Sequence, residues 1–379
     1  MGILVITWNF PPRRGGIESL IGHLCASLKK KHSVFVITSH AACDIATDEA
    51  IFRPRWPGLL GFFLYAVFRG AVVLYRNHSI KVILGGSALM TPLVLVLARL
   101  FRRRAVVQTH GLDLTYRNRV YQLLCVRWLR HCDRVIANSQ YTASLAVAKR
   151  APQSVISVIP PGIDSRRFAT SVPVEALKKE MDLEGKRVML FVGRLARRKG
   201  LGEFIQFSLA EIVKAIPEAC LLIVGENPTA SLTHRDDVLS EIRVIVADLQ
   251  LENHVRFLGS VNDEKLVKIY QLCDVVVLPV LEMKEDIEGF GIVLLEAAAA
   301  GKPSVATRLG GMADAVEDGK SGILVGPQDY DALRQTLIQL LRNDTHRRIM
   351  GRYARERIEQ QFSWDQISER YELAFASPY

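Results

Sequence analysis

Two carboxylates stand eight positions apart in residues 282–301, and their setting suits them to chemistry. Glu288 comes just before a Gly-Phe-Gly turn, and Glu296 lies in a run of helix formers, Ile292 to Ala300, that carries no other charge. We expect this helix to be apolar nearly all round and therefore buried. A buried carboxylate is unfavourable unless it is hydrogen-bonded or paired. The two acids are therefore either a structural cap and a surface charge or parts of a ligand site.

The position of these acids favours a ligand site. They follow an apolar strand predicted at 274–279. In open α/β sheets, ligands bind just beyond the carboxyl ends of the strands, where the next helix begins.

Cations occupy an equivalent place after the strand predicted at 188–192. Arg194 and Lys199 flank a glycine turn that leads into a helix. An arginine can chelate two oxygens and a lysine supplies a point charge, so this arrangement suits a diphosphate at a helix N-terminus. The alternative is that they are solvated loop cations, which is how we interpret Arg197 and Arg198 between them.

Two further positions lie at strand ends in the first half of the chain. Gly15 and Gly16 separate a strand at 2–7 from a helix, and they either let the backbone approach an anion or merely shape the turn. His110 follows a strand at 105–109 and is either catalytic or a structural hydrogen-bonding group. Asp113 could orient it or cap the next helix. Asn138-Ser139 is expected to cap a helix.

No metal site or disulfide framework is expected. Asp329-Tyr-Asp331 is the only D-x-D motif, and it opens a predicted helix, where capping explains it. The six cysteines form no C-x-x-C pair, which favours a reducing cytosol. They are Cys25, Cys43, Cys125, Cys132, Cys220 and Cys273.

The chain alternates strands and helices twice, which predicts two parallel sheets wrapped by helices. The predicted strands are 2–7, 34–38, 81–85, 105–109, 134–137 and 155–159, then 188–192, 220–224, 255–258, 275–278 and 304–306. Predicted helices include 58–77, 88–101, 117–131, 139–149, 329–342 and 345–361. With 379 residues it is long enough for two domains. We place a first domain at 1–163, ending at the linker Pro160-Pro161-Gly162, and a second domain at 164–363. Residues 364–379 are expected to form a helix that returns to the first domain. The predicted fold class is α/β, with two Rossmann-like doubly wound domains facing a central cleft.

Charge is unevenly distributed along the chain. Residues 1–165 carry 21 Lys and Arg against 7 Asp and Glu, a net +14, whereas the remainder carries 28 against 32, a net −4. A basic half suggests an anionic membrane, a nucleic acid or a phosphorylated substrate, or only a solvated surface. Nucleic acid is disfavoured because aromatic and basic residues are not interleaved. We expect no signal peptide, and the apolar stretch 59–75, interrupted by Arg69, should be too short to span a membrane.

Several motifs now combine in one order along the chain. They are F-x-P-P-x-x-G-G at 10–16, Gly193-Arg194 with Lys199-Gly200, E-G-F-G-x4-E at 288–296, Gly301-x-Pro303 and Gly310-Gly311. Over essentially the whole chain this set resembles the retaining family 4 glycosyltransferases of the GT-B fold. Within that family it looks closest to the phosphatidylinositol mannosyltransferase branch.

The resemblance implies that the first domain lies on the acceptor side and that the second binds the nucleotide sugar. It also implies a role for each matching residue. Arg194 and Lys199 match the pair that holds the donor diphosphate, and Glu288 matches the acid that contacts the donor-sugar hydroxyls. Glu296 matches the acid that binds the ribose. The remaining matches are Gly15-Gly16, in the loop near the phosphate and sugar, Phe290-Gly291-Ile292, whose backbone lies beside them, and His110, near the C6 hydroxyl of the donor sugar.

The resemblance also implies the reaction. We expect a metal-independent transferase that needs no cofactor and moves a hexose, first of all mannose from GDP-mannose, to a lipid-linked or cell-envelope glycan acceptor. A UDP-sugar donor, a nucleotide-sugar epimerase or soluble disaccharide synthase, and a non-catalytic nucleotide-sugar-binding protein stay open as alternatives. Base contacts are expected near 226–228 and 258–261.

We expect the enzyme to be cytoplasmic and peripheral on the inner face of the membrane. Three clusters of the basic half would dock on anionic lipid. They are Lys29–Lys31, Phe62–Arg76 and Arg102–Arg104.

Overall fold

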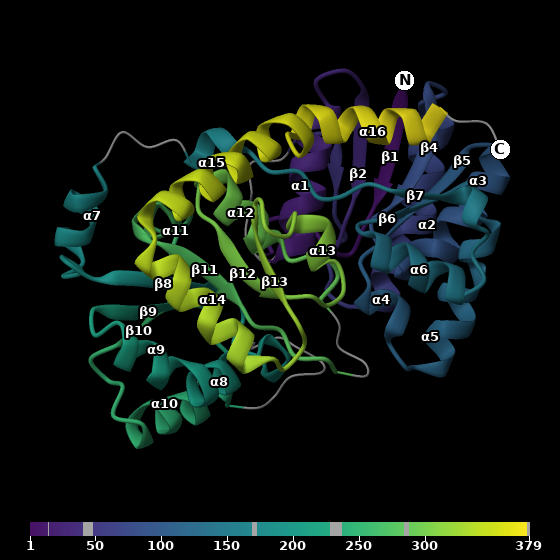
Figure 1. Ribbon diagram of the computed structural model, residues 1–379. Helices are drawn as coiled ribbons and strands as arrows, with labels where there is room; N and C mark the ends of the chain where they lie inside the picture. The colour runs from purple at the N-terminus through teal and green to yellow at the C-terminus, as the bar shows by residue number, and fades with distance from the viewer. Residues whose placement is uncertain (14, 41–47, 169–172, 228–236, 284–287, 377–379) are drawn as a thin grey trace. The chain divides into compact units, whose positions relative to one another are not determined.

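The computed structural model describes the chain apart from residues 14, 41–47, 169–172, 228–236, 284–287 and 377–379. It divides into two compact units, shown in Figure 1. Unit 1 comprises Met1–Gly162 with Trp364–Tyr379, and unit 2 comprises Ile163–Ser363. Ile163 belongs to unit 2, one residue earlier than we placed the boundary, because its N–H donates to the carbonyl oxygen of Phe362 (2.8 Å).

Unit 1 is built on a parallel sheet with, in the described residues, the strand order β3-β2-β1-β4-β5-β6-β7. The order reverses between β1 and β4, as in doubly wound sheets. The strands are β1 (Gly2–Ile6), β2 (Ser33–Ile37), β3 (Ile51–Phe52), β4 (Ile80–Gly85), β5 (Arg104–Thr109), β6 (Arg134–Ala137) and β7 (Ile156–Val158). All but β3 were predicted, within one residue or so at each end.

Helices cover both faces of this sheet (Figure 1). Helices α1 and α16 pack on one face, and α2, α3 and η2 pack on the other. The helices are α1 (Gly16–Leu28), α2 (Leu59–Arg76), η1 (Ala88–Met90), α3 (Thr91–Phe101), α4 (Leu112–Thr115), α5 (Arg119–Leu124), η2 (Val126–His131), α6 (Gln140–Ala148), η3 (Gln153–Val155) and α16 (Trp364–Ala376).

Helix α16, the last helix of the chain, packs on α1. Ile367, Tyr371 and Phe375 are each at most 2% exposed and share one core with α1. Ion pairs flank this contact, including Lys30 with Asp365 (2.5 Å). The last helix is therefore held by both apolar burial and charge.

The three lysines that follow α1 form ion pairs, and their docking on lipid stays a prediction. Lys31 lies 3.5 Å from Glu369 of α16, and Lys29 pairs with Asp48. These lysines also lie on the sheet face opposite to α2 and α3. The predicted basic clusters therefore belong to two different faces.

Helix α2 has one buried and one exposed side. Phe62 and Ala66 are fully buried, whereas Leu60, Leu64 and Phe68 are 76%, 66% and 72% exposed. Our expectation that this stretch is too short to span a membrane was wrong. α2 has 18 residues and is, among the described helices, the one that is long and apolar enough to cross a membrane, by length and composition only. Such a helix is weak support for a span, and its buried side holds it against the sheet of unit 1.

Unit 2 repeats the architecture with the described strand order β10-β9-β8-β11-β12-β13, all parallel. The strands are β8 (Arg187–Val192), β9 (Ala219–Val224), β10 (Val255–Gly259), β11 (Val275–Leu278), β12 (Ser304–Thr307) and β13 (Gly322–Val325). Five of them were predicted. Strand β13 was missed because four residues among glycines give no periodic signal.

Helices again cover both faces of the sheet. The α8–η6–α9 segment, α10 and α14 pack together, as do η4, α7, α11, α12 and α15. The helices are η4 (Ser165–Phe168), α7 (Val174–Glu180), η5 (Arg197–Lys199), α8 (Leu201–Phe204), the π-helix η6 (Ile205–Leu209), α9 (Ala210–Ala215), α10 (Val238–Asp248), α11 (Asp263–Leu272), α12 (Ile292–Ala299), α13 (Met312–Ala315), α14 (Tyr330–Arg342) and α15 (Asp344–Gln361).

Replacement of a buried aromatic residue in α16 tests its contribution to unit 1. We expect Phe375→Ala to destabilise unit 1 by about 3–5 kcal/mol, because it leaves a cavity in the core. All four tryptophans lie in unit 1, so tryptophan fluorescence during urea unfolding reports on this unit. The matched control, Leu373→Ala, alters a residue that is 68% exposed on the same helix and should change stability by less than about 0.5 kcal/mol. Equal effects of the two changes would contradict the packing described.

Candidate active site

The loop after β8 carries the predicted cations, and two glycines fix its course. Gly193 donates its N–H to the carbonyl oxygen of Val224 at the end of β9 (3.0 Å). Gly200 has a φ of 67°, and a side chain there would strike the carbonyl oxygen of Pro279 just past β11. The loop therefore lies at the carboxyl ends of three neighbouring strands, the edge where such sheets bind ligands.

The short helix η5 turns three consecutive cations in different directions. Arg197 is exposed and pairs with Glu241 of α10 (2.6 Å). The side chains of Arg198 and Lys199 are only 9% and 8% exposed, and both donate to Oε2 of Glu288, Lys199 at 2.6 Å. Our interpretation of Arg198 as a solvated cation was wrong. The tight 3-10 turn separates neighbouring side chains by about a third of a turn, which sends Arg197 outward.

The charges of this cluster perturb one another strongly. Burial alone would raise the pKa of Glu288, but the charges and hydrogen bonds of Lys199 and Arg198 outweigh it and lower the pKa to about 2. Burial lowers the pKa of Lys199 against the attraction of Glu288, and the charges of Arg198 and Arg194 add to the lowering. Arg194 itself is exposed on the same loop. Two cations on one carboxylate, with Arg194 near enough to lower the pKa of Lys199, leave an excess of positive charge that suits an anionic ligand.

The backbone after Glu288 is held by a second glycine turn. Gly311 donates its N–H to the carbonyl oxygen of Glu288 (3.2 Å), and a side chain at Gly311 would strike the backbone of Gly289. Phe290 is 2% exposed and packs near Phe362, with ring centroids 6.4 Å apart. The position of Glu288 is thus fixed by close backbone packing as well as by its ion pairs.

Helix α12 begins as predicted, immediately after the Gly-Phe-Gly turn. Gly291 has a φ of 82° in the left-handed region, and Ile292 is the first helical residue. The first N–H groups of a helix have no partner within it. Those of α12 therefore lie at the same sheet edge as Glu288, as an anion site requires.

Glu296 of α12 is half-buried and has a hydrogen-bond donor that the sequence did not reveal. The hydroxyl of Tyr270, a fully buried residue of α11, donates to Oε2 of Glu296 (2.7 Å). Burial raises the pKa of Glu296, and the bond from Tyr270 offsets part of this rise. Glu296 therefore already has one structural partner, and its expected contact with a ribose stays a prediction.

In unit 1, the predicted glycine turn lies beside an acid. Gly15 precedes α1 and Gly16 is its first residue. A side chain at Gly15 would meet the carboxylate of Glu18, which is 9% exposed and accepts a hydrogen bond from Nδ2 of Asn9 (2.7 Å). Glu18 already complements the positive end of α1, so an anionic ligand would share this position with it.

His110 and Asp113 both bind the backbone at the carboxyl edge of the unit 1 sheet. His110 is 8% exposed, and its Nε2 lies 2.8 Å from the carbonyl oxygen of Gly86 after β4. Asp113 accepts hydrogen bonds from the N–H groups of His110 (2.9 Å) and Ala88 (3.0 Å). Asp113 therefore fixes the backbone of His110 and the start of η1, and the imidazole has a structural partner.

Two capping predictions are confirmed. Ser139 caps α6 by accepting from the N–H of Thr142 (3.0 Å), and Asp329 caps α14 by accepting from that of Ala332 (2.9 Å). Asn138, next to Ser139, is 6% exposed, and its Oδ1 has no hydrogen-bond partner among the described residues. In the part of the chain that the structure describes, no cluster of three His, Cys, Asp or Glu side chains could hold a metal ion.

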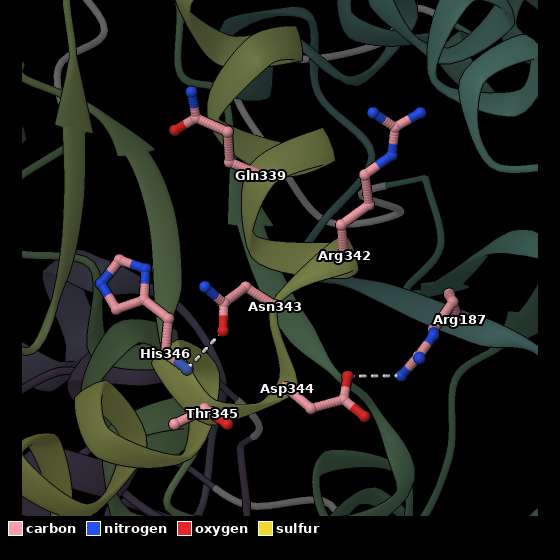
Figure 2. Close-up of a pocket in the computed structure, with 7 residues that line it drawn as sticks. All are labelled: Arg187, Gln339, Arg342, Asn343, Asp344, Thr345 and His346. Carbon is pink, nitrogen blue, oxygen red and sulfur yellow. Dashed lines mark hydrogen bonds and ion pairs between the residues drawn. The ribbon is translucent and has the colours of Figure 1, made fainter.

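A pocket of about 740 Å³ lies at the opposite edge of the unit 2 sheet. It surrounds the first residue of β8 and the junction of α14 with α15, and an ion pair of Arg187 with Asp344 (2.8 Å) crosses it (Figure 2). It contains no predicted site residue. Its lining residues are Arg187, Gln339, Arg342, Asn343, Asp344, Thr345 and His346. Because it lies at the amino end of β8, we do not assign the donor to it.

Comparisons with known proteins agree with these features. The family model described as Glycosyl transferases group 1 matches residues 174–357, and that described as Glycosyltransferase Family 4 matches residues 14–167. The GDP-mannose-dependent alpha-(1-6)-phosphatidylinositol monomannoside mannosyltransferase of Mycolicibacterium smegmatis is 30% identical over 92% of this chain and 91% of its own. The chain belongs to the family 4 glycosyltransferases.

A further relative and a solved structure match this family 4 glycosyltransferase over nearly its whole length. The protein of the same name from Mycobacterium tuberculosis is 28% identical over 97% of this chain and 96% of its own. The structure of Anabaena HepE in complex with UDP is 21% identical and matches 100% of both chains with a TM-score of 0.82. The predicted α/β class with two doubly wound domains, the GT-B fold, is confirmed. The protein is thus a glycosyltransferase that uses a nucleotide-sugar donor.

Replacing Glu288 by an uncharged residue tests its ion pairs with Arg198 and Lys199, and the test needs no ligand. Glu288→Gln should destabilise unit 2 by about 3–5 kcal/mol at pH 7, because it leaves two buried cations without their counter-charge. The folded-state pKa of Glu288 is about 2 against an ordinary 4.5, so the contribution is complete above pH 4.5 and is lost as the pH falls toward 2. Thermal unfolding followed by circular dichroism from pH 7 to pH 3 should show the two proteins converging.

The matched control is Glu282→Gln, which changes an exposed acid of the same segment. It should leave the melting temperature within about 1 °C of the wild type. A difference between wild type and Glu288→Gln that does not shrink with falling pH would contradict the assigned ion pairs.

Proposed function

We propose that this protein is a retaining, metal-independent mannosyltransferase that moves mannose from GDP-mannose to a lipid-linked acceptor of the cell envelope. The observation that carries the proposal is the excess of cations around Glu288 at the carboxyl edge of the unit 2 sheet. Mannose and GDP are favoured because the relatives that match nearly the whole chain at 28–30% identity are named GDP-mannose-dependent mannosyltransferases.

The cations suit the leaving group of such a reaction. The bond between C1 of the sugar and the phosphate oxygen breaks, and the nucleoside diphosphate leaves with the bonding electrons. Arg194 and Lys199 stabilise the charge that develops on it. The acceptor hydroxyl oxygen bonds to C1 on the same face, and its proton passes to the departing phosphate oxygen.

Glu288 in this scheme positions the sugar and does not attack it. Its carboxylate stays ionised, because Lys199 and Arg198 hold it so, and it can accept hydrogen bonds from sugar hydroxyls. The backbone of Phe290-Gly291-Ile292 offers N–H groups to the phosphate, and Glu296 accepts from the ribose. In unit 1, the Gly15-Gly16 turn approaches the phosphate and sugar, and His110 approaches the C6 hydroxyl.

The nucleobase would meet the ends of β9 and β10. The carbonyl oxygen of Glu226 accepts a hydrogen bond from the N–H of Leu195 (2.9 Å), and Oε1 of Glu226 accepts one from the N–H of Ser260 (3.0 Å). The bond from Ser260 joins the two loops that we expect to contact the base, and the bond from Leu195 ties the first of them to the loop after β8. Pro228, the last residue of the first of these predicted loops, lies outside the described residues.

A panel of nucleotide sugars with EDTA present tests the donor. GDP-mannose at about 100 times its dissociation constant should raise the stability of the folded protein by about 2.7 kcal/mol, seen as a higher melting temperature. UDP-glucose, UDP-galactose and UDP-N-acetylglucosamine should give smaller shifts. A larger shift with a UDP-sugar would overturn the choice of GDP-mannose, and a shift that needs Mg²⁺ would overturn metal independence.

The substitution Arg194→Ala, assayed by turnover of the donor, completes this test of the donor site. It should lower kcat about 100-fold, because Arg194 acts on charge that develops as the bond breaks. Arg197→Ala is the matched control, since Arg197 is exposed on the same loop and pairs with Glu241. A rise of KM alone in Arg194→Ala would mean that Arg194 binds only the ground state.

The lipid acceptor and peripheral location are supported by the exposed side of α2 and by its neighbour α3. Val96 and Leu100 of α3 are 58% and 69% exposed, and α3 packs on α2. Arg76, Arg99 and Arg102 are exposed on or next to the same helices. Apolar side chains can enter the lipid interface while each nearby cation contributes about 1 kcal/mol on anionic lipid.

Co-sedimentation with vesicles of phosphatidylcholine and phosphatidylglycerol tests this surface. The double change Leu64→Glu with Phe68→Glu should weaken binding at low salt about tenfold or more. Val244→Glu, at a 59% exposed position of α10 in unit 2, is the control and should bind like the wild type. Failure of the wild type to bind at low salt would contradict a peripheral location.

A further inference from the structure

One oxygen of Glu288 accepts from two buried cations. Oε2 accepts from Nζ of Lys199 at 2.6 Å and from Nη1 of Arg198. The side chains of Arg198, Lys199 and Glu288 are 9%, 8% and 15% exposed. Since an unpaired buried charge is costly, a second cation on one carboxylate calls for an explanation.

The backbone holds Arg198 in this place independently of its side chain. Its carbonyl oxygen accepts from the N–H of Leu281 (2.8 Å), which belongs to the segment between β11 and Glu288. The next residue but one, Gly200, packs against Pro279 of that segment. Arg198 is therefore anchored to the segment that leads to Glu288, whereas Arg197 faces α10.

The arrival of a diphosphate would change the partners of this cluster. If the proposed function is right, Lys199 donates to the diphosphate, and Glu288 then loses one of its two cations. A carboxylate left in a buried position without cations tends to take up a proton and turn into a poor acceptor for sugar hydroxyls. Arg198 then remains as the cation paired with Glu288.

We propose that Arg198 is a positioning residue that keeps the Glu288 carboxylate charged and directed at the donor sugar while Lys199 binds the diphosphate. The inference rests on the proposed function and adds a third residue to its machinery. Its consequence is selective: Arg198 matters for the sugar part of the donor, through Glu288, and little for the nucleoside diphosphate.

The test compares Arg198→Gln and Arg198→Lys with the control Arg197→Gln. Calorimetric titration with GDP and with GDP-mannose measures both parts of the donor. We expect Arg198→Gln to weaken GDP-mannose about tenfold but GDP less than about twofold, and to lower kcat/KM about tenfold or more. In a Glu288→Gln background the same change should have almost no further effect, because its partner is already neutral.

The pH profile separates positioning from a merely structural role. Arg198 lowers the pKa of Glu288 together with Lys199, whereas the charge of Arg194 lowers the pKa of Lys199. Loss of Arg198 therefore raises that pKa, and the acid limb of kcat/KM should move to higher pH in Arg198→Gln and return toward wild type in Arg198→Lys. Arg197→Gln should keep the wild-type profile.

The outcomes are distinguishable. Equal losses of GDP and GDP-mannose, or losses that add fully to those of Glu288→Gln, would make Arg198 a diphosphate ligand and overturn the inference alone. An unmoved acid limb in Arg198→Gln would also overturn it. A wild type that binds no nucleotide sugar of the panel would overturn the proposed function and the inference together.

Discussion

The buried ion pairs of Arg198 and Lys199 with Glu288 join two segments that are 89 and 90 residues apart in sequence. A buried charge without a partner destabilises the fold. Moving either segment away would therefore leave an unpaired buried charge on the other. Parallel strands bring this pairing within reach, because β8 and β11 are neighbours and end at the same edge. The order of strands in the sheet thus decides where the charges can meet, and the charges in turn fix the loops.

Glycines make that meeting possible. The loop after β8 approaches Pro279 so closely that only Gly200 fits, and the turn before α12 is backed by Gly311 against Gly289. Close backbone contact leaves the side chains of Lys199 and Glu288 little freedom. The site is therefore preorganised, which lowers the entropy that ligand binding has to overcome. In unit 1 the corresponding edge is stabilised differently, by hydrogen bonds of His110 and Asp113 to the backbone.

Most of the fold could be predicted because buried parallel strands are short apolar runs and the amphipathic helices repeat at 3.6 residues. Strand β6 (Arg134–Ala137) and helix α15 (Asp344–Gln361) illustrate this, since both lie within a residue of their predicted bounds. The misses, β3 and β13, are two and four residues long. Strand β3 is too short to show a local pattern, and the glycines in and around β13 interrupt its apolar run. Helix α2 lies within a residue of the helix predicted near 58–77, but its apolar stretch was judged too short to span a membrane because Arg69 interrupts it.

The residue types and order of the motifs were sufficient to indicate the family and the two-domain class, and they singled out Glu288 and Lys199, which the structure brings together. The direction of each side chain depended on tertiary contacts. Arg197, Arg198 and Lys199 are alike in sequence, yet one pairs with α10 and two with Glu288. We expected Lys29–Lys31 to dock on lipid, and the structure shows that Lys30 and Lys31 form ion pairs with Asp365 and Glu369 of α16. In each case the partner lies far away in the chain, so burial and pairing arise only once the sheets are assembled.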